Sequence, residues 1–171
     1  NFDQVVKDGL AGRSLTRAVA YVITTESGDE KNFFEALGKM GIETKTKDLQ
    51  IFYGGAKKAD WDVGLAVDAI RLAPKVDTIV LATGDGDFVP LVTFLKEHFG
   101  VQVEVISFGR SSSSKLREAC EDFIDMCDHP EKFLIGYRTR RPMKKNNKHG
   151  TKKVDVQEYS DEDLGIFGGD K

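Results

Sequence analysis

Apolar and polar positions repeat with two different periods along the first 137 residues, and these periods predict alternating helices and strands. Apolar residues three or four positions apart predict helices over 2–10, 30–40, 62–73, 88–99 and 111–122. Short runs of β-branched and apolar residues, or strict alternation, predict strands over 17–24, 42–47, 78–82, 101–107 and 123–126. Strands that alternate with helices of this length are typical of a parallel sheet with helices on both faces, so we expect an α/β fold.

Two stretches need a more specific prediction. The predicted strand over 17–24 is apolar almost throughout, as expected for a strand that is covered on both faces. Residues 48–53 extend the preceding strand or form a loop, and residues 54–59 are predicted to be a flexible basic loop.

A Gly-rich acidic turn, residues 83–87, lies between the strand over 78–82 and the helix over 88–99. Such a turn is expected at the carboxyl edge of an α/β sheet, where these sheets bind ligands. The turn carries Asp85 and Asp87, whose charges repel each other unless a cation lies between them. Mg²⁺ prefers carboxylate oxygens, so the pair is a candidate metal site. The alternative is a polar turn in which Asp87 caps the following helix.

A third carboxylate is expected at the same edge, because helix starts and strand ends share one edge of a parallel sheet. Asp62 lies in the first turn of the helix over 62–73, so Asp62, Asp85 and Asp87 are the predicted catalytic and metal-binding residues. The alternative role for Asp62, or for Asp60, is that of an ordinary helix cap. Asp68 lies six residues further along, well round the helix, and is ranked lower as a surface acid or a buried paired one.

Basic and hydroxyl residues lie near these acids in the sequence. Lys57 and Lys58, Thr83, and Ser111 with Ser112 are candidate contacts for a substrate phosphate. Lysines in a Gly-rich loop are also commonly just solvated, and a serine at a helix start is also simply a good cap.

Two other uses of the Asp-Gly-Asp turn were weighed. An EF-hand loop beginning at Asp85 requires Gly at its sixth position and Glu at its twelfth, where this chain has Pro90 and Lys96. The Asp-x-Asp pattern also resembles the first motif of haloacid-dehalogenase-like phosphatases, with Ser107 as a match to their second motif. Little chain remains after Ser107 for the rest of that fold, so the phosphatase stays the weaker alternative.

Composition limits the class of protein. The chain has 171 residues, of which 40% are hydrophobic and 31% charged, and it contains no apolar run of about 20 residues that could span a membrane. It begins without the basic start and apolar core of a secretory signal, so we expect a cytoplasmic protein. Two cysteines are too few for a disulfide scaffold.

The net charge of the chain is −3, but the charged residues are distributed unevenly along it. Residues 138–153 contain eight Lys and Arg and no acid, whereas residues 154–171 contain six acids and one Lys. Subtraction leaves 25 − 9 = 16 bases and 28 − 6 = 22 acids for residues 1–137. The basic stretch is predicted to be disordered and could attract nucleic acid; solvating the tail, or pairing with the acids after it, is an equal alternative.

Four blocks of the sequence together resemble the NYN domains of the LabA-like group, which are PIN-like. They are 57–73, 83–91, 103–109 and 114–125, with the sequences KKADWDVGLAVDAIRLA, TGDGDFVPL, VEVISFG and SKLREACEDFID. The resemblance implies a domain over residues 1–135, an αβα sandwich with a mainly parallel sheet, and a disordered tail over 136–171. It also implies a ribonuclease centre dependent on Mg²⁺ or Mn²⁺ and formed by Asp62, Asp85 and Asp87.

One element of that family has no counterpart in the sequence. The family begins with a strand that ends in Asp, a metal ligand, whereas here the helix over 2–10 comes first. We therefore expect the first strand of the family to be missing from this sequence.

The expected function is a metal-dependent endoribonuclease with RNA as its partner and no membrane association. The alternative is a non-catalytic RNA-binding or regulatory module on the same fold. The sequence leaves open whether two copies form a homodimer.

Overall fold

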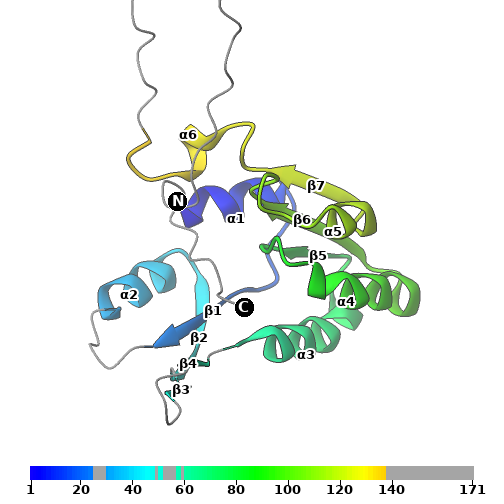
Figure 1. Ribbon diagram of the computed structural model, residues 1–171, viewed down its shortest axis with the longest axis horizontal. Coiled ribbons are helices and arrows are strands. Elements are labelled where there is room, and N and C mark those ends of the chain that lie inside the picture. The colour runs from blue at the N-terminus through cyan, green and yellow to red at the C-terminus, as the bar shows by residue number, and fades with distance from the viewer. Residues whose placement is uncertain (25–29, 49, 52–56, 59, 138–171) are drawn as a thin grey trace, which may run out of the picture. The chain divides into compact units, whose positions relative to one another are not determined.

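The computed structural model describes residues 1–24, 30–48, 50–51, 57–58 and 60–137 (Figure 1). These residues belong to one structural unit that covers Asn1–Thr139. The predicted disordered tail over 136–171 lies almost entirely outside the described residues, and the domain boundary at 135 stays a prediction. No helix in the described part is long and apolar enough to cross a membrane.

Seven strands and six α-helices are formed by the described residues. The strands are β1 (Ala18–Thr24), β2 (Ile42–Asp48), β3 (Gln50–Ile51), β4 (Lys57–Lys58), β5 (Thr78–Leu81), β6 (Gln102–Ser107) and β7 (Asp122–Asp125). The helices are α1 (Phe2–Leu10), α2 (Lys31–Lys39), α3 (Asp62–Leu72), α4 (Val89–Phe94), α5 (Ser114–Ala119) and α6 (Pro130–Phe133). Three shorter helical turns are η1 (Ala73–Lys75), η2 (Gly86–Phe88) and η3 (Leu95–Phe99), the last a π-helical turn that continues α4.

The parallel strands form two sheets among the described residues. β1 pairs with β2 over its whole length, and β6 lies between β5 and β7. The expected α/β class with parallel strands and helical cover is confirmed, but the single central sheet of the prediction is divided in two. β1 and β5 each have one hydrogen-bonded neighbour in the described structure.

The two faces of the β5–β6–β7 sheet carry different helices, as the alternation of side chains along β6 requires. Val103 and Val105 lie on the face that packs against α3, α4 and α5, where they belong to the main hydrophobic core. On the opposite face Glu104 binds Arg13, which follows α1. Gly9 of α1 brings its backbone close to this face as well, because a Cβ there would lie 3.2 Å from Val80. The sheet is therefore covered on both sides (Figure 1).

Three local predictions need correction. The predicted helix over 111–122 is limited to Ser114–Ala119, because Glu121 bonds to the backbone of Val103 and β7 begins at the next residue, Asp122. The predicted loop over 54–59 is wrong at Lys57 and Lys58, which form β4 opposite β3. The strand predicted to be covered on both faces, β1, has no fully buried residue.

Candidate active site

The acidic turn follows β5 as predicted, and its conformation is fixed by two side-chain to backbone hydrogen bonds. The Asp85 carboxylate accepts a hydrogen bond from the amide of Asp87 at 2.9 Å, and the Thr83 hydroxyl accepts one from the amide of Asp85 at 3.2 Å. Asp85 is thus the residue that caps η2, which corrects the alternative prediction that Asp87 is the cap. Both acids are exposed to solvent.

The two glycines of the turn are required by close contact with a serine loop that follows β6. A Cβ on Gly84 would lie 2.9 Å from the hydroxyl oxygens of both Ser107 and Ser112, and a Cβ on Gly86 would lie 2.7 Å from that of Ser113. The amide of Ser113 also donates to the Gly84 carbonyl at 2.9 Å. Any larger residue would push the acidic turn away from its support.

Ser111 and Ser112, predicted to contact substrate, begin this loop rather than a helix. The Ser112 hydroxyl donates to the Phe108 carbonyl at 2.8 Å and lies 2.9 Å from the hydroxyl of Ser107. The exposed Ser111 hydroxyl donates to the same carbonyl at 3.2 Å. Ser113 occupies the cap position of α5 but makes no side-chain cap bond. The serines therefore brace the acidic turn, and of the two candidates only Ser111 is solvent-exposed.

Asp62 is the first residue of α3 and lies within the electrostatic field of the acidic turn. Asp62 is exposed as a residue, but partial burial of its carboxylate raises its pKa, and the negative charges of Asp60, Asp85 and Asp87 raise it further. The Asp62 amide donates to the Asp60 carboxylate at 2.7 Å in the turn that leads into α3, whose N-cap is Trp61 without a side-chain cap bond. The charges of Asp85 and Asp87 thus act on Asp62, as expected for acids at one edge of the sheet.

The same acids were tested as a metal site. Carboxylates that repel one another have the donor chemistry that Mg²⁺ and Mn²⁺ prefer, and Asp62, Asp85 and Asp87 would hold such an ion. However, no three acidic, His or Cys side chains of the described residues are gathered closely enough to form a site. The carboxylates are therefore the right donor type for a divalent cation, but in this structure the described acids are too far apart to complete the ligand shell of the cation.

Asp68 has a different environment, consistent with its lower ranking. Its side chain is buried, forms an ion pair with Lys45, and accepts a hydrogen bond from the Tyr21 hydroxyl at 2.8 Å. The bond to Lys45, against the opposing effect of burial, holds the pKa of Asp68 below its ordinary value. Arg71, one turn further along α3, lies 3.7 Å away. Asp68 is therefore a buried, paired acid.

Two candidate residues cannot be placed at the level of side chains. Lys57 and Lys58 form β4, in register with Ile51 and Gln50 of β3, and their side chains lie outside what the structure describes. Their predicted contact with a substrate phosphate stays a prediction.

Asp125, at the end of β7, is an acid that the sequence reasoning did not single out. Its carboxylate accepts hydrogen bonds at 2.8 Å from the amides of both Gly109 and Cys127. Burial acts to raise the pKa of Asp125, but these bonds outweigh it and hold the pKa below its ordinary value. A Cβ on Gly109 would lie 2.0 Å from the carboxylate. The available signal was its place at a strand end, directly before a turn.

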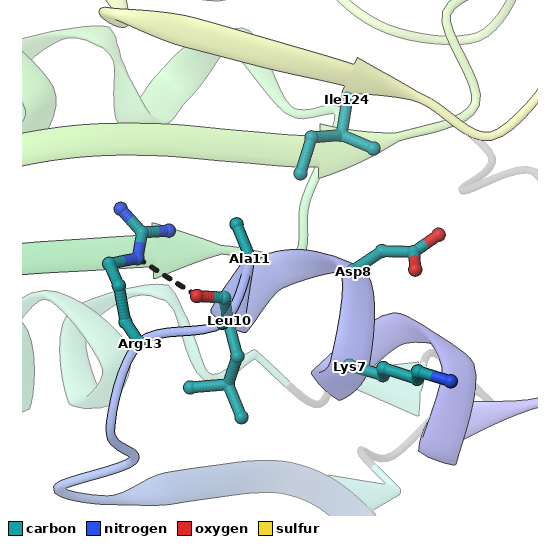
Figure 2. Close-up of a pocket in the computed structure, with 7 residues that line it drawn as sticks. Lys7, Asp8, Leu10, Ala11, Arg13 and Ile124 are labelled. Atoms are coloured by element: carbon teal, nitrogen blue, oxygen red, sulfur yellow. Dashed lines mark hydrogen bonds between the residues drawn. The ribbon is translucent and has the colours of Figure 1, made fainter.

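A surface hollow lies beside α1 and contains none of the predicted site residues (Figure 2). It is lined by Lys7, Asp8, Leu10, Ala11, Gly12, Arg13 and Ile124. Arg13, its most prominent cation, is bound to both oxygens of Glu104 at 2.6 Å and to the carbonyls of Gly9 and Leu10. Because its charge is already neutralised, the hollow is a poor phosphate site.

Comparison with known proteins decides the family. The profile of the NYN domain family matches residues 1–127. The chain belongs to the NYN domain family. The LabA-like assignment also holds: over 120 residues this NYN chain is 28% identical to the low amplitude and bright protein LabA of Synechococcus elongatus. That match covers 67% of this chain and 64% of LabA, so the chain spans less than two thirds of its relative's length.

A solved structure supports the same fold. A protein of unknown function from Vibrio parahaemolyticus, VPA0982, is 30% identical and superimposes with a TM-score of 0.66. The similarity covers 74% of this chain and 78% of that one. NYN domains have a PIN-like nuclease fold and are generally associated with RNA, so nuclease chemistry is the class of activity to test.

Proposed function

We propose that this NYN domain is an endoribonuclease that depends on Mg²⁺ or Mn²⁺ and hydrolyses RNA phosphodiester bonds at Asp62, Asp85 and Asp87. The observation that carries the proposal is the placement of these acids, with Asp85 and Asp87 in the turn after β5 and Asp62 at the start of α3, where partial burial and the charges of Asp60, Asp85 and Asp87 raise the pKa of Asp62. A binding surface for RNA alone has no use for repelling carboxylates where phosphates must lie, because a cation is needed to reverse the local field.

Each candidate residue has a different proposed role. The three carboxylates bind the cation, which when present supplies a more acidic water and neutralises phosphate charge. The Thr83 hydroxyl holds the acidic turn through its bond with the Asp85 amide, and Ser112 packs against Gly84 of the same turn. The exposed Ser111 is proposed to contact a phosphate of the RNA, together with Lys57 and Lys58. The basic stretch 138–153 is proposed to add to RNA affinity by neutralising phosphates.

A non-catalytic RNA-binding or regulatory module is the second candidate. The specific observation in its favour is that the described residues do not gather three metal ligands. Either function is proposed to be exercised in the cytoplasm, and homodimer formation would not alter the acids named above.

The test is cleavage of labelled single-stranded RNA by the full chain with Mn²⁺, with Mg²⁺, and with a chelator. We expect cleavage only with metal. Asp62→Asn and Asp87→Asn should each reduce the rate by at least about a hundredfold, the scale of losing a main electrostatic stabiliser. RNA binding, measured by fluorescence anisotropy, should survive both changes.

Asp77→Asn is the matched control, because Asp77 is an exposed acid directly before β5, at the end of that strand opposite to the acidic turn. This variant should cleave RNA at the wild-type rate. Binding of RNA without cleavage under every metal condition would favour the regulatory module instead.

A further inference from the structure

The first turn of α3, which carries Asp62, is attached to the β1–β2 sheet by a set of side chains that the proposed chemistry does not use. Trp61 precedes Asp62, and its indole N–H donates to the Val22 carbonyl of β1 at 3.0 Å. The Trp61 ring lies 5.4 Å from that of Tyr21. Gly64 lets the helix backbone rest against the indole, since a Cβ there would lie 2.7 Å from the ring.

A second attachment lies nearly two turns further along the helix. Asp68 is buried and accepts a hydrogen bond from Tyr21 while it pairs with Lys45. Tyr21 and Lys45 are direct register partners on β1 and β2, so one face of the sheet presents both to the helix. Tyr21 takes part in both attachments, through its ring to Trp61 and through its hydroxyl to Asp68.

A third contact comes from β2. The Lys47 ammonium donates to the Asp60 carbonyl at 3.0 Å and lies 5.9 Å from the centre of the Trp61 ring. Together these contacts fix the axial position and the rotation of α3, and with them the position of Asp62. By contrast, Asp85 and Asp87 are held by the serine loop on the other sheet.

We propose that Tyr21, Lys45 and Asp68 form a positioning clamp that holds α3 so that the Asp62 carboxylate faces Asp85 and Asp87. Asp68 then acts through the helix and not as a ligand or a catalytic group. The effect of the clamp on metal binding rests on the proposed function. The clamp itself is defined by contacts that involve no metal or RNA.

Trp61 offers a direct readout, because it is the only tryptophan in the chain and lies between the clamp and Asp62. Asp68→Asn keeps the shape of the side chain and removes its charge, and Tyr21→Phe removes only the hydroxyl. In the full-length protein, at a temperature where circular dichroism shows it folded, both variants should shift Trp61 emission to the red and increase quenching by acrylamide. Glu43→Gln is the control, because it breaks an exposed ion pair with Arg17 on the same two strands. It should leave the emission unchanged.

The consequence for the site is measured as Mn²⁺ affinity of the folded protein by calorimetry. Both clamp variants should weaken binding by about tenfold, the scale seen when a residue that orients a metal ligand is removed. Asp62→Asn should weaken it more, and Asp62→Asn combined with Asp68→Asn should be no worse than Asp62→Asn alone.

Three outcomes would overturn the clamp. Unchanged Trp61 emission in both variants would show that the contacts do not hold this turn. Lower thermal stability with unchanged Mn²⁺ affinity would show a purely structural role. A loss for Asp68→Asn as large as that for Asp62→Asn, with Tyr21→Phe neutral, would make Asp68 a ligand. If the wild-type protein binds no Mn²⁺, the proposed function fails, whereas the fluorescence arm still decides whether the clamp exists.

Discussion

Two regions of this protein are stabilised by different means. In residues 60–137 the core is continuous, and Val92, Leu95, Val103, Val105 and Leu116 have no exposed side-chain surface. The region of β1, α2 and β2 has only Leu37 and Ile42 buried, while Ile23, Phe33 and Met40 are 37–42% exposed.

The difference shows how the candidate site depends on both regions. Asp85 and Asp87 belong to a turn fixed by the well-packed region, whereas α3 packs into that core through Ala69 and is also bound to the thinly packed β1–β2 sheet by polar and aromatic contacts near Asp62. Polar contacts are directional and fix the position of a helix, but they contribute little net stability. Apolar burial contributes more stability and constrains the position less. The position of Asp62 is therefore expected to be more sensitive to small changes than that of Asp85.

The largest expected contrast is in the core. Leu95→Ala should lower the free energy of unfolding by about 3 kcal/mol, because it empties a fully enclosed site. Ile23→Ala should cost about 1 kcal/mol or less, since much of that side chain is already in water. Urea unfolding of the two variants measures both values. Equal losses would mean that β1 is as well covered as the other sheet and would remove the contrast between the regions.

A smaller effect, with a defined pH dependence, is expected at Asp125. Asp125→Asn should cost about 1–2 kcal/mol at pH 7, since it weakens two amide hydrogen bonds to a charged acceptor. The folded-state pKa of Asp125 is lowered, so its contribution is present above the unfolded pKa of about 3.9 and is lost as the pH falls through the folded value. Urea unfolding between pH 7 and pH 2.5 should show the two proteins converging at the acid end. A constant difference would assign the loss to packing.

Local pattern was sufficient to predict the order of the longer helices and strands, but not the short strands β3 and β4 or the helix α6. α1 matches its predicted range, Asp85 and Asp87 follow β5, and Asp62 begins α3, whereas a joint site of the three acids stays a prediction. This part of the fold follows from periodicity and chain order alone.

The errors arise where distant residues compete with local preference. The helix over 111–122 is shortened by pairing of Glu121 with Val103, and the role of Asp68 depends on Tyr21, 47 positions away. The apolar run of β1 predicts cover on both faces, yet its burial is set by how many strands and helices actually lie against it. Pairings of this kind are not encoded in any short window of sequence.

The smallest stability effect tests the central claim most directly, namely that Asp62 faces Asp85 and Asp87. The folded-state pKa of Asp62 is raised, so its protonated form favours the folded state. This contribution to the free energy of unfolding is fully present below the unfolded-state pKa of about 3.9, and it is lost as the pH rises through the folded-state pKa. Asn carries no charge and avoids this loss. The effect is limited to less than about 1 kcal/mol at pH 7, because Asp62 is exposed and water screens the repulsion.

The measurement is thermal unfolding of the wild type and Asp62→Asn in chelator at pH 7 and at pH 3, and then at pH 7 with saturating Mn²⁺. The account predicts that Asp62→Asn is the more stable protein at pH 7 in chelator. This advantage should vanish at pH 3, and Mn²⁺ should reverse the order by stabilising the wild type more. If Asp62→Asn gains no stability in chelator and Mn²⁺ shifts both proteins equally, the three carboxylates do not act as one site.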